Sequence, residues 1–181
     1  AQRLARMFAG LMENYATPLM ASYESPSFTP NQRIFGIQDV LTFQYMFAEM
    51  SEAKAWKVRS ETAMSNFITQ TVYPDGGWLE PSFNYTNASV LSIEKLLNLD
   101  VSAPWRVQIE ETVANYYRVM EAIRSPFGTL PQLGNLNWFT YGGTGSPTHE
   151  TFTDDSLLLP YSGYAVQRTG WAADDSYLFL Y

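Results

Sequence analysis

The segment covering residues 102–125 constrains the fold most, because it combines a helix start, a helical repeat and a helix stop. Ser102 is expected to cap a helix, and Pro104 fits its first turn, where the missing N–H has no intrahelical partner. The repeat ends at the sequence Ser-Pro-Phe-Gly. Apolar residues recur between these signals at helical spacing, at Val107, Val113, Tyr117, Met120 and Ile123. We therefore expect a long amphipathic helix that needs helical partners.

Weaker forms of the same pattern predict further helices on both sides of residue 73. They cover residues 2–15, 39–50 and 51–71, and a run that contains Val90, Ile93 and Leu96. Asp39 is expected to cap the second of these helices. Residues 16–36 contain three prolines and a glycine among Ser, Thr and Asn, which predicts a long loop. Helices that follow one another with short connections favour an array of antiparallel helical hairpins.

The character of the sequence changes at Thr129, after which Gly, Thr, Asn and aromatic residues dominate without a periodic pattern. We expect irregular structure bordering a cleft there. Residues 163–169 and 176–181 alternate or are rich in β-forming residues, and residues 170–175 are expected to turn between them. The predicted fold is therefore mainly α over residues 1–160, leading into the first strands of an antiparallel sheet over residues 161–181. Because both ends lie within predicted elements, we expect a piece of a longer protein.

Composition narrows the class of partner. Apolar residues make up 46% of the chain and aromatic residues 15%, which is typical of a globular protein. A net charge of −7 argues against nucleic acid or an anionic membrane surface as the main partner. The absence of cysteine excludes a disulfide framework.

Residues 73–87, YPDGGWLEPSFNYTN, form a polar and aromatic break between two predicted helices. Asn87 is expected to cap the second of them. The break offers Trp78, Glu80, Asn84 and Tyr85, and a ring, a carboxylate, an amide and a phenol together suit a carbohydrate. An equally simple interpretation is that the aromatic side chains cover a helix end. Glu80 can act on a sugar, or it can accept hydrogen bonds from the turn at Gly76 and Gly77.

Two segments together resemble the heparinase II/III-like polysaccharide lyases. One is the Asp-Gly-Gly loop with Glu80 and Asn84-Tyr85, and the other is LPQLGN followed by YSGYAVQRTGW and DDSYLFL. The resemblance implies a toroid of α-helical hairpins followed by a large antiparallel β-sandwich. It also implies cleavage of a uronic-acid polysaccharide by β-elimination without a cofactor, an acidic polysaccharide as partner, and a secreted or periplasmic location.

The resemblance also implies roles for individual residues. Tyr85 is expected to handle a proton, Asn84 to contact the uronate carboxylate, and Tyr141 to be a second phenol at the site. Thr86 departs from the family pattern, in which a histidine commonly follows the tyrosine, and Asn135 replaces an aspartate. Arg168 matches a strand arginine of the family and is expected to form an ion pair. The expected substrate-binding residues are Trp78, Glu80, Asn87, Gln132 and Asn135.

Two other functions stay open at this stage. A glycoside hydrolase on a similar toroid needs two carboxylates across the cleft, and Glu80 with Asp154 or Asp155 is the pairing offered. A non-catalytic glycan-binding helical domain needs neither a base nor an acid. His149, the one histidine, lies in a segment expected to be exposed, and no metal-ligand spacing surrounds it.

Overall fold

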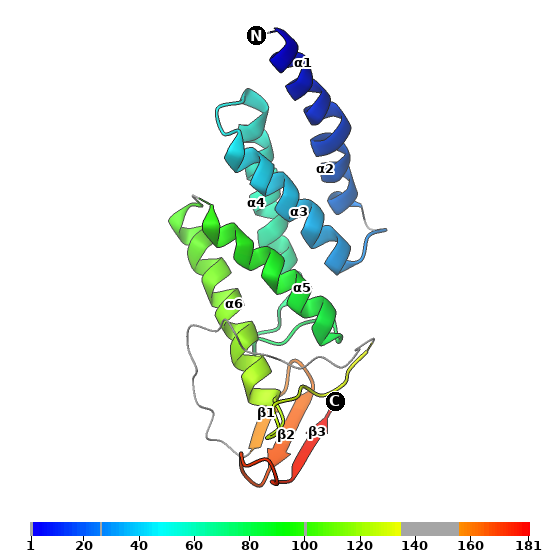
Figure 1. The fold of residues 1–181 in the computed structure, drawn as a ribbon, viewed down its shortest axis with the longest axis vertical. Helices are drawn as coiled ribbons and strands as arrows, with labels where there is room; N and C mark the ends of the chain where they lie inside the picture. Colours follow the sequence, from blue (N-terminus) through cyan, green and yellow to red (C-terminus); the bar gives the residue numbers. More distant parts are fainter. Residues whose placement is uncertain (1, 26, 100, 135–155) are drawn as a thin grey trace.

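The computed structural model describes residues 2–25, 27–99, 101–134 and 156–181. Helices follow one another along the long axis, and a small sheet lies at the end remote from the N-terminus (Figure 1). The protein is thus mainly helical and ends in a sheet, as predicted. The helical elements are α1 (Gln2–Leu11), the π-helical turn η1 (Met12–Ala16), α2 (Thr17–Glu24), α3 (Pro30–Met46), α4 (Ser51–Thr71), α5 (Phe83–Glu94), the 3-10 turn η2 (Lys95–Asn98) and α6 (Ala103–Ile123).

The helices that carry the clearest local signals lie where the sequence predicts them. Helix α6 begins directly after Ser102, has Pro104 in its first turn and ends before Arg124. Helix α4 spans the predicted residues. The side chain of Ser102 makes no capping hydrogen bond, so Pro104 carries more of the start signal than Ser102 does.

The loop predicted for residues 16–36 is wrong, because most of this stretch is helical. Pro18 lies in the first turn of α2 and Pro30 is the first residue of α3, so two of the three prolines start helices instead of breaking them. Thr29 and Gln32 form a capping box, in which the Thr29 N–H donates to Gln32 Oε1 over 3.1 Å. Asp39 consequently lies within α3 and caps nothing.

One continuous core runs through the helical array into the sheet. Helix α2 packs on α3, α3 packs on α4 and α5, and α5 packs on α6. Side chains from these helices are joined in the core by Leu159, Tyr164 and Val166 of the sheet. Within the described part of the chain, no helix is both long enough and apolar enough to cross a membrane.

The sheet contains three antiparallel strands in the order β1 (Ser156–Leu159), β2 (Tyr164–Arg168) and β3 (Tyr177–Leu180). Strands β2 and β3 are the two predicted ones. Strand β1 was not predicted, and it precedes the expected boundary near residue 160. Leu159 pairs with Tyr164, Val166 with Phe179, and Arg168 with Tyr177, so these side chains share the face that packs toward the helices.

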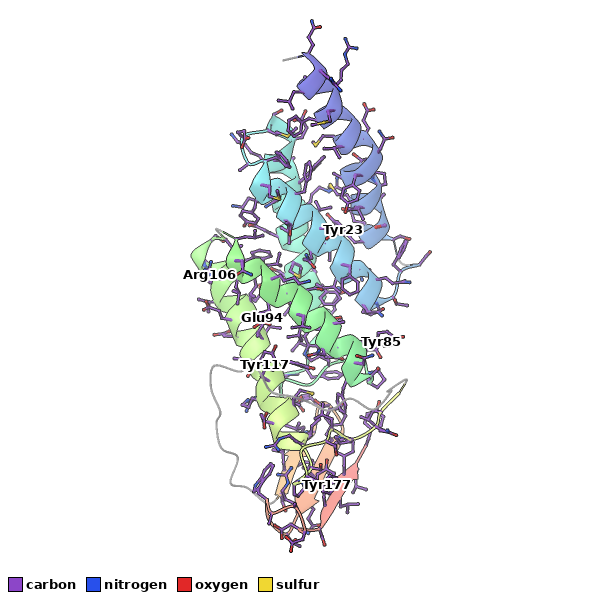
Figure 2. All side chains as sticks on the ribbon, in the orientation of Figure 1. Tyr23, Tyr85, Glu94, Arg106, Tyr117 and Tyr177 are labelled. Atoms are coloured by element: carbon purple, nitrogen blue, oxygen red, sulfur yellow. The ribbon has the colours of Figure 1, made fainter. Side chains whose placement is uncertain are left out.

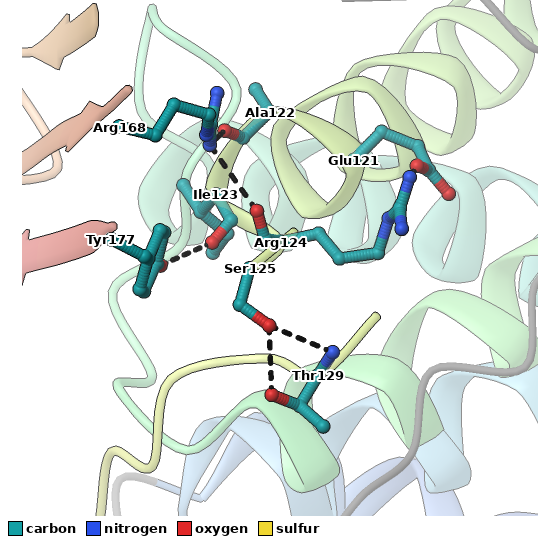
Figure 3. A network of polar contacts seen from close by, with 8 residues as sticks. All are labelled: Glu121, Ala122, Ile123, Arg124, Ser125, Thr129, Arg168 and Tyr177. Atoms are coloured by element: carbon teal, nitrogen blue, oxygen red, sulfur yellow. Dashed lines mark hydrogen bonds and ion pairs between the residues drawn. The ribbon is translucent and has the colours of Figure 1, made fainter. Parts of the chain in front are cut away.

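The sheet is attached to the last turn of α6 by Arg168 and Tyr177 (Figure 3). Arg168 is only 4% exposed, and its Nη2 donates to the carbonyl oxygens of Ala122 at 2.6 Å and Arg124 at 3.2 Å. The Tyr177 hydroxyl donates to the Ile123 carbonyl oxygen at 2.5 Å. Burial raises the pKa of Tyr177 to about 12, despite the nearby Arg168 charge, so this hydroxyl remains a donor. Arg168 thus caps the carbonyls at the negative end of a helix. The ion pair expected for its side chain stays a prediction.

Candidate functional site

The chain between α4 and α5 folds into a tight turn that is fixed by its own backbone. The Tyr73 N–H donates to Gly77 O at 2.8 Å, Gly76 N–H donates to Tyr73 O at 2.9 Å, and Leu79 N–H donates to Thr71 O at 2.8 Å. Gly76 has a φ of +89°, and a Cβ at this position would lie 3.1 Å from Val119 Cγ2 of α6. A glycine is therefore needed both for the backbone conformation and for contact with α6.

Asp75 joins this turn to the β1–β2 turn with both oxygens of its carboxylate. Oδ2 accepts the N–H of Tyr161 at 2.8 Å and that of Ser162 at 2.9 Å. Oδ1 accepts the Ser162 hydroxyl at 2.5 Å and the Gly77 N–H at 3.2 Å. Partial burial by itself would raise the pKa of Asp75, but the hydrogen bonds from Ser162, Gly77 and Tyr161 outweigh it and hold the pKa below its usual value.

The lowered pKa of Asp75 predicts an acid-sensitive contribution to stability. Because the folded-state pKa is below the unfolded one, the contribution is complete above the unfolded pKa and is lost as pH falls through the folded one. The difference in free energy of unfolding between wild type and Asp75→Asn should therefore shrink on acidification, measured by urea unfolding over a pH series. A difference that stays constant with pH would contradict this account.

Trp78 is buried, which contradicts its predicted role as a stacking platform. Its side chain is 5% exposed and belongs to the core cluster. The ring packs against Phe67, with centroids 6.3 Å apart, and edge-on against Tyr116 at 6.4 Å. Because both neighbours and the core cover the ring, it has no face left for a sugar. Burial of so large an aromatic side chain stabilises the fold.

Glu80 and Asn87, both expected to bind substrate, make hydrogen bonds within the protein near the start of α5. Glu80 Oε1 accepts the Ser82 N–H at 3.0 Å, so Glu80 supports the residue before α5, while Asp75 supports the turn at Gly77. Asn87 lies inside α5 and caps nothing, which corrects the predicted cap. Its Oδ1 accepts the hydroxyl of Tyr116 at 3.3 Å.

Asn84 and Tyr85 are both exposed in the first turn of α5, at the end of the helix nearest the sheet (Figure 2). Tyr85 is 41% exposed. Phe83 beside them is 2% exposed and packs edge-on against Tyr164 of β2, with centroids 5.9 Å apart. Thr86 faces inward, where its hydroxyl donates to the Glu80 carbonyl oxygen at 3.0 Å. The buried contacts of Phe83 and Thr86 thus fix the first turn of α5, and the amide of Asn84 and the phenol of Tyr85 are exposed on it.

Gln132 lies in a segment that passes the start of α5. Gly134, two residues further on, has a φ of +63°, and a Cβ there would lie 3.2 Å from Ser82 Cβ. Gln132 is exposed. At Gly134 the segment therefore approaches the residue that precedes α5, and a role for Gln132 in binding stays a prediction.

Several predicted residues lie outside the described residues, namely Asn135, Tyr141, His149, Asp154 and Asp155. Asp175 lies in the β2–β3 turn, where it accepts the Thr169 hydroxyl at 3.0 Å and the Ala172 N–H at 2.7 Å. No group of three or more potential metal ligands occurs among residues 2–25, 27–99, 101–134 and 156–181.

Sequence reasoning missed the part that Asp75 and Ser162 play. The local signal for Asp75 was present, since an aspartate two residues before a glycine N–H is typical of an Asx turn. Its second partner lies 87 residues away in the chain, and no local pattern indicates such a pairing.

The fold is thus an array of packed helices that leads into a three-stranded antiparallel sheet, with a polar loop at the junction. The chain belongs to the heparinase II/III family, because the family model for the heparinase II/III N-terminus matches residues 4–133. No curated protein matches the chain.

Solved structures of heparinases have the same fold. Heparinase III, the BT4657 gene product, aligns with a TM-score of 0.70 at 19% identity, covering 96% of this chain and 31% of that one. A mutant of the heparan sulfate lyase HepC from Pedobacter heparinus aligns with a TM-score of 0.72 at 19% identity, again over 96% of this chain and 31% of that one. The chain therefore spans about a third of the length of these proteins.

Proposed function

We propose that the protein to which this chain belongs is a polysaccharide lyase that cleaves a uronic-acid glycan, such as a glycosaminoglycan or alginate, by β-elimination. The observation that carries the proposal is the exposed pair Asn84 and Tyr85 at the start of α5, beside the junction with the sheet. Membership of the heparinase II/III family and the fold shared with heparan sulfate lyases support it.

The chemistry assigned to the pair follows from what elimination requires. The proton at C5 becomes acidic when a donor neutralises the C6 carboxylate, and the Asn84 amide is such a donor. Tyr85 then transfers a proton, either from C5 as a base or to the leaving oxygen as an acid. Among the described residues no side chain caps the start of α5, and the positive end of the helix also favours a carboxylate.

A hollow at the other end of the helical array does not suit this substrate. It has a volume of about 560 Å³ and lies between α1 and the α3–α4 connection. Its wall is aromatic at Phe8, Phe47 and Trp56, and it carries the carboxylates Glu13, Glu49 and Glu52. Three carboxylates repel a polyanion, so the start of α5 is the better candidate.

The nature of the products tests this proposal. The full-length protein is incubated with a panel of uronate glycans, while ultraviolet absorbance and new reducing ends are followed together. Elimination creates a double bond conjugated with the uronate carboxylate, so we expect both signals to rise in parallel. Reducing ends without absorbance would identify a hydrolase, and silence in both assays would favour a glycan-binding module. Either result would refute the lyase.

A further inference from the structure

We infer that Asp75 is a positioning residue, which holds the first turn of α5 in register with the β1–β2 turn of the sheet. The effect on catalysis rests on the proposed function. The hydrogen bonds from Tyr161 and Ser162 to Asp75, called the tie below, are a property of the fold and do not depend on it. Asp75 contacts neither Asn84 nor Tyr85 in the hydrogen bonds described above, and it acts through the backbone that leads to them.

The first step is the tie between the loop and the sheet. Consecutive backbone N–H groups of Tyr161 and Ser162 donate to one carboxylate oxygen, and the Ser162 hydroxyl donates to the other. Hydrogen bonds to a charged acceptor are roughly twice as strong as neutral ones. The contact is also sterically close, since a Cβ at Gly77 would lie 1.8 Å from Ser162 Oγ. The two turns therefore lie against each other with no space for an alternative side chain.

The second step is the connection from the tie to α5. The turn that carries Asp75 is closed by its own backbone hydrogen bonds, and Trp78 anchors it in the core. Glu80 follows directly, accepting the Ser82 N–H with its side chain and the Thr86 hydroxyl with its carbonyl oxygen. A displacement of Asp75 is thus passed on through a short, hydrogen-bonded segment to the turn that carries Asn84 and Tyr85.

The third step is a parallel contact that the tie keeps in place. Phe83, the first residue of α5, packs on Tyr164, the first residue of β2, two residues after Ser162. The β1–β2 turn therefore meets the α5 region at two neighbouring points, one polar and one aromatic. Losing the polar point removes the hydrogen bonds that join the two turns directly, which permits small shifts of the first turn of α5.

Small shifts matter in a reaction that needs an amide and a phenol on one sugar unit. A misplacement of about 1 Å lowers rates by as much as about 100-fold. In the full-length lyase we expect Asp75→Asn to lower kcat by about 10- to 100-fold with KM changed less than about threefold. Ser162→Ala should lower kcat by the same route, so the double variant should lose less than the product of the two single losses.

Asp175→Asn is the matched control, because Asp175 also accepts a hydroxyl and a backbone N–H within a turn of the sheet. We expect it to leave kcat unchanged. Hydrogen exchange of the full-length protein supplies a readout that does not depend on activity. Asp75→Asn should accelerate exchange at Tyr161 and Ser162, and at Ser82 and Thr86, whose N–H groups are hydrogen-bonded at the start of α5. Asp175→Asn should not.

The two measurements separate the inference from the proposed function. If the wild type is inactive on every uronate glycan, the proposed function fails, and the exchange measurement alone decides the tie. Unchanged exchange at Ser82 and Thr86 would overturn the inference. In an active enzyme, an unchanged kcat for Asp75→Asn would also overturn it. The same holds if the double variant with Ser162→Ala loses the full product of the two single losses in kcat.

Discussion

Replacing Tyr85 with phenylalanine is expected to lower kcat for elimination by about 100- to 10,000-fold, the range typical of a lost general acid or base. The change removes one hydroxyl from a side chain that is 41% exposed, so folding should be nearly unaffected. KM should change little, because the ring remains and the hydroxyl acts mainly in the transition state. The measurement is the initial rate of ultraviolet absorbance on the glycan that the wild type cleaves.

A tyrosine of similar exposure supplies the control for this experiment. Tyr15 is 48% exposed in η1, near the opposite end of the helical array. Tyr15→Phe should leave kcat unchanged. Equal losses in both variants, or no loss in Tyr85→Phe, would remove Tyr85 from the mechanism.

The largest effect on stability is expected for Arg168→Met. This change removes a buried cation from two carbonyl oxygens and from the face of Trp171, whose ring centre lies 3.9 Å from the guanidinium carbon. Charged hydrogen bonds contribute about 1.5–3 kcal/mol and a buried cation–π contact up to about 2 kcal/mol. We expect the free energy of unfolding to fall by about 3 kcal/mol, measured by urea unfolding of the full-length protein at neutral pH.

An exposed arginine shows whether this loss reflects burial and capping. Arg59 pairs with Glu24 at 2.6 Å, but its side chain is 56% exposed. Arg59→Met should cost less than about 1 kcal/mol, because water screens exposed ion pairs. Comparable losses for the two variants would show that Arg168 contributes only as a surface charge does.

Where the fold was predictable from sequence, the signals were local. Helix α6 combines a proline in its first turn, a helical apolar repeat and a Ser-Pro stop, and the structure follows all three. The same proline rule holds for α2 and α3, but a cluster of prolines among polar residues predicts a loop. Strand β1 has only four residues, and so short an apolar run does not distinguish a strand from a helix.

The site was predictable in its residue types but not in its packing. Asn84 and Tyr85 are exposed, but they lie in the first turn of α5 and not in the loop in which their composition placed them. The same composition placed Trp78 at the surface, whereas the core requires it between Phe67 and Tyr116. The roles of Asp75 and Arg168 depend on partners 86 and 46 residues away, in segments that only the tertiary fold brings together.

A crystal structure of full-length Tyr85→Phe with a uronate oligosaccharide would test the central claim most directly, because the slow variant should retain intact substrate. The account predicts a uronate whose carboxylate accepts a hydrogen bond from the Asn84 amide, with C5 or the leaving oxygen facing the substituted ring at position 85. An oligosaccharide bound away from the first turn of α5, with no contact to Asn84, would contradict it.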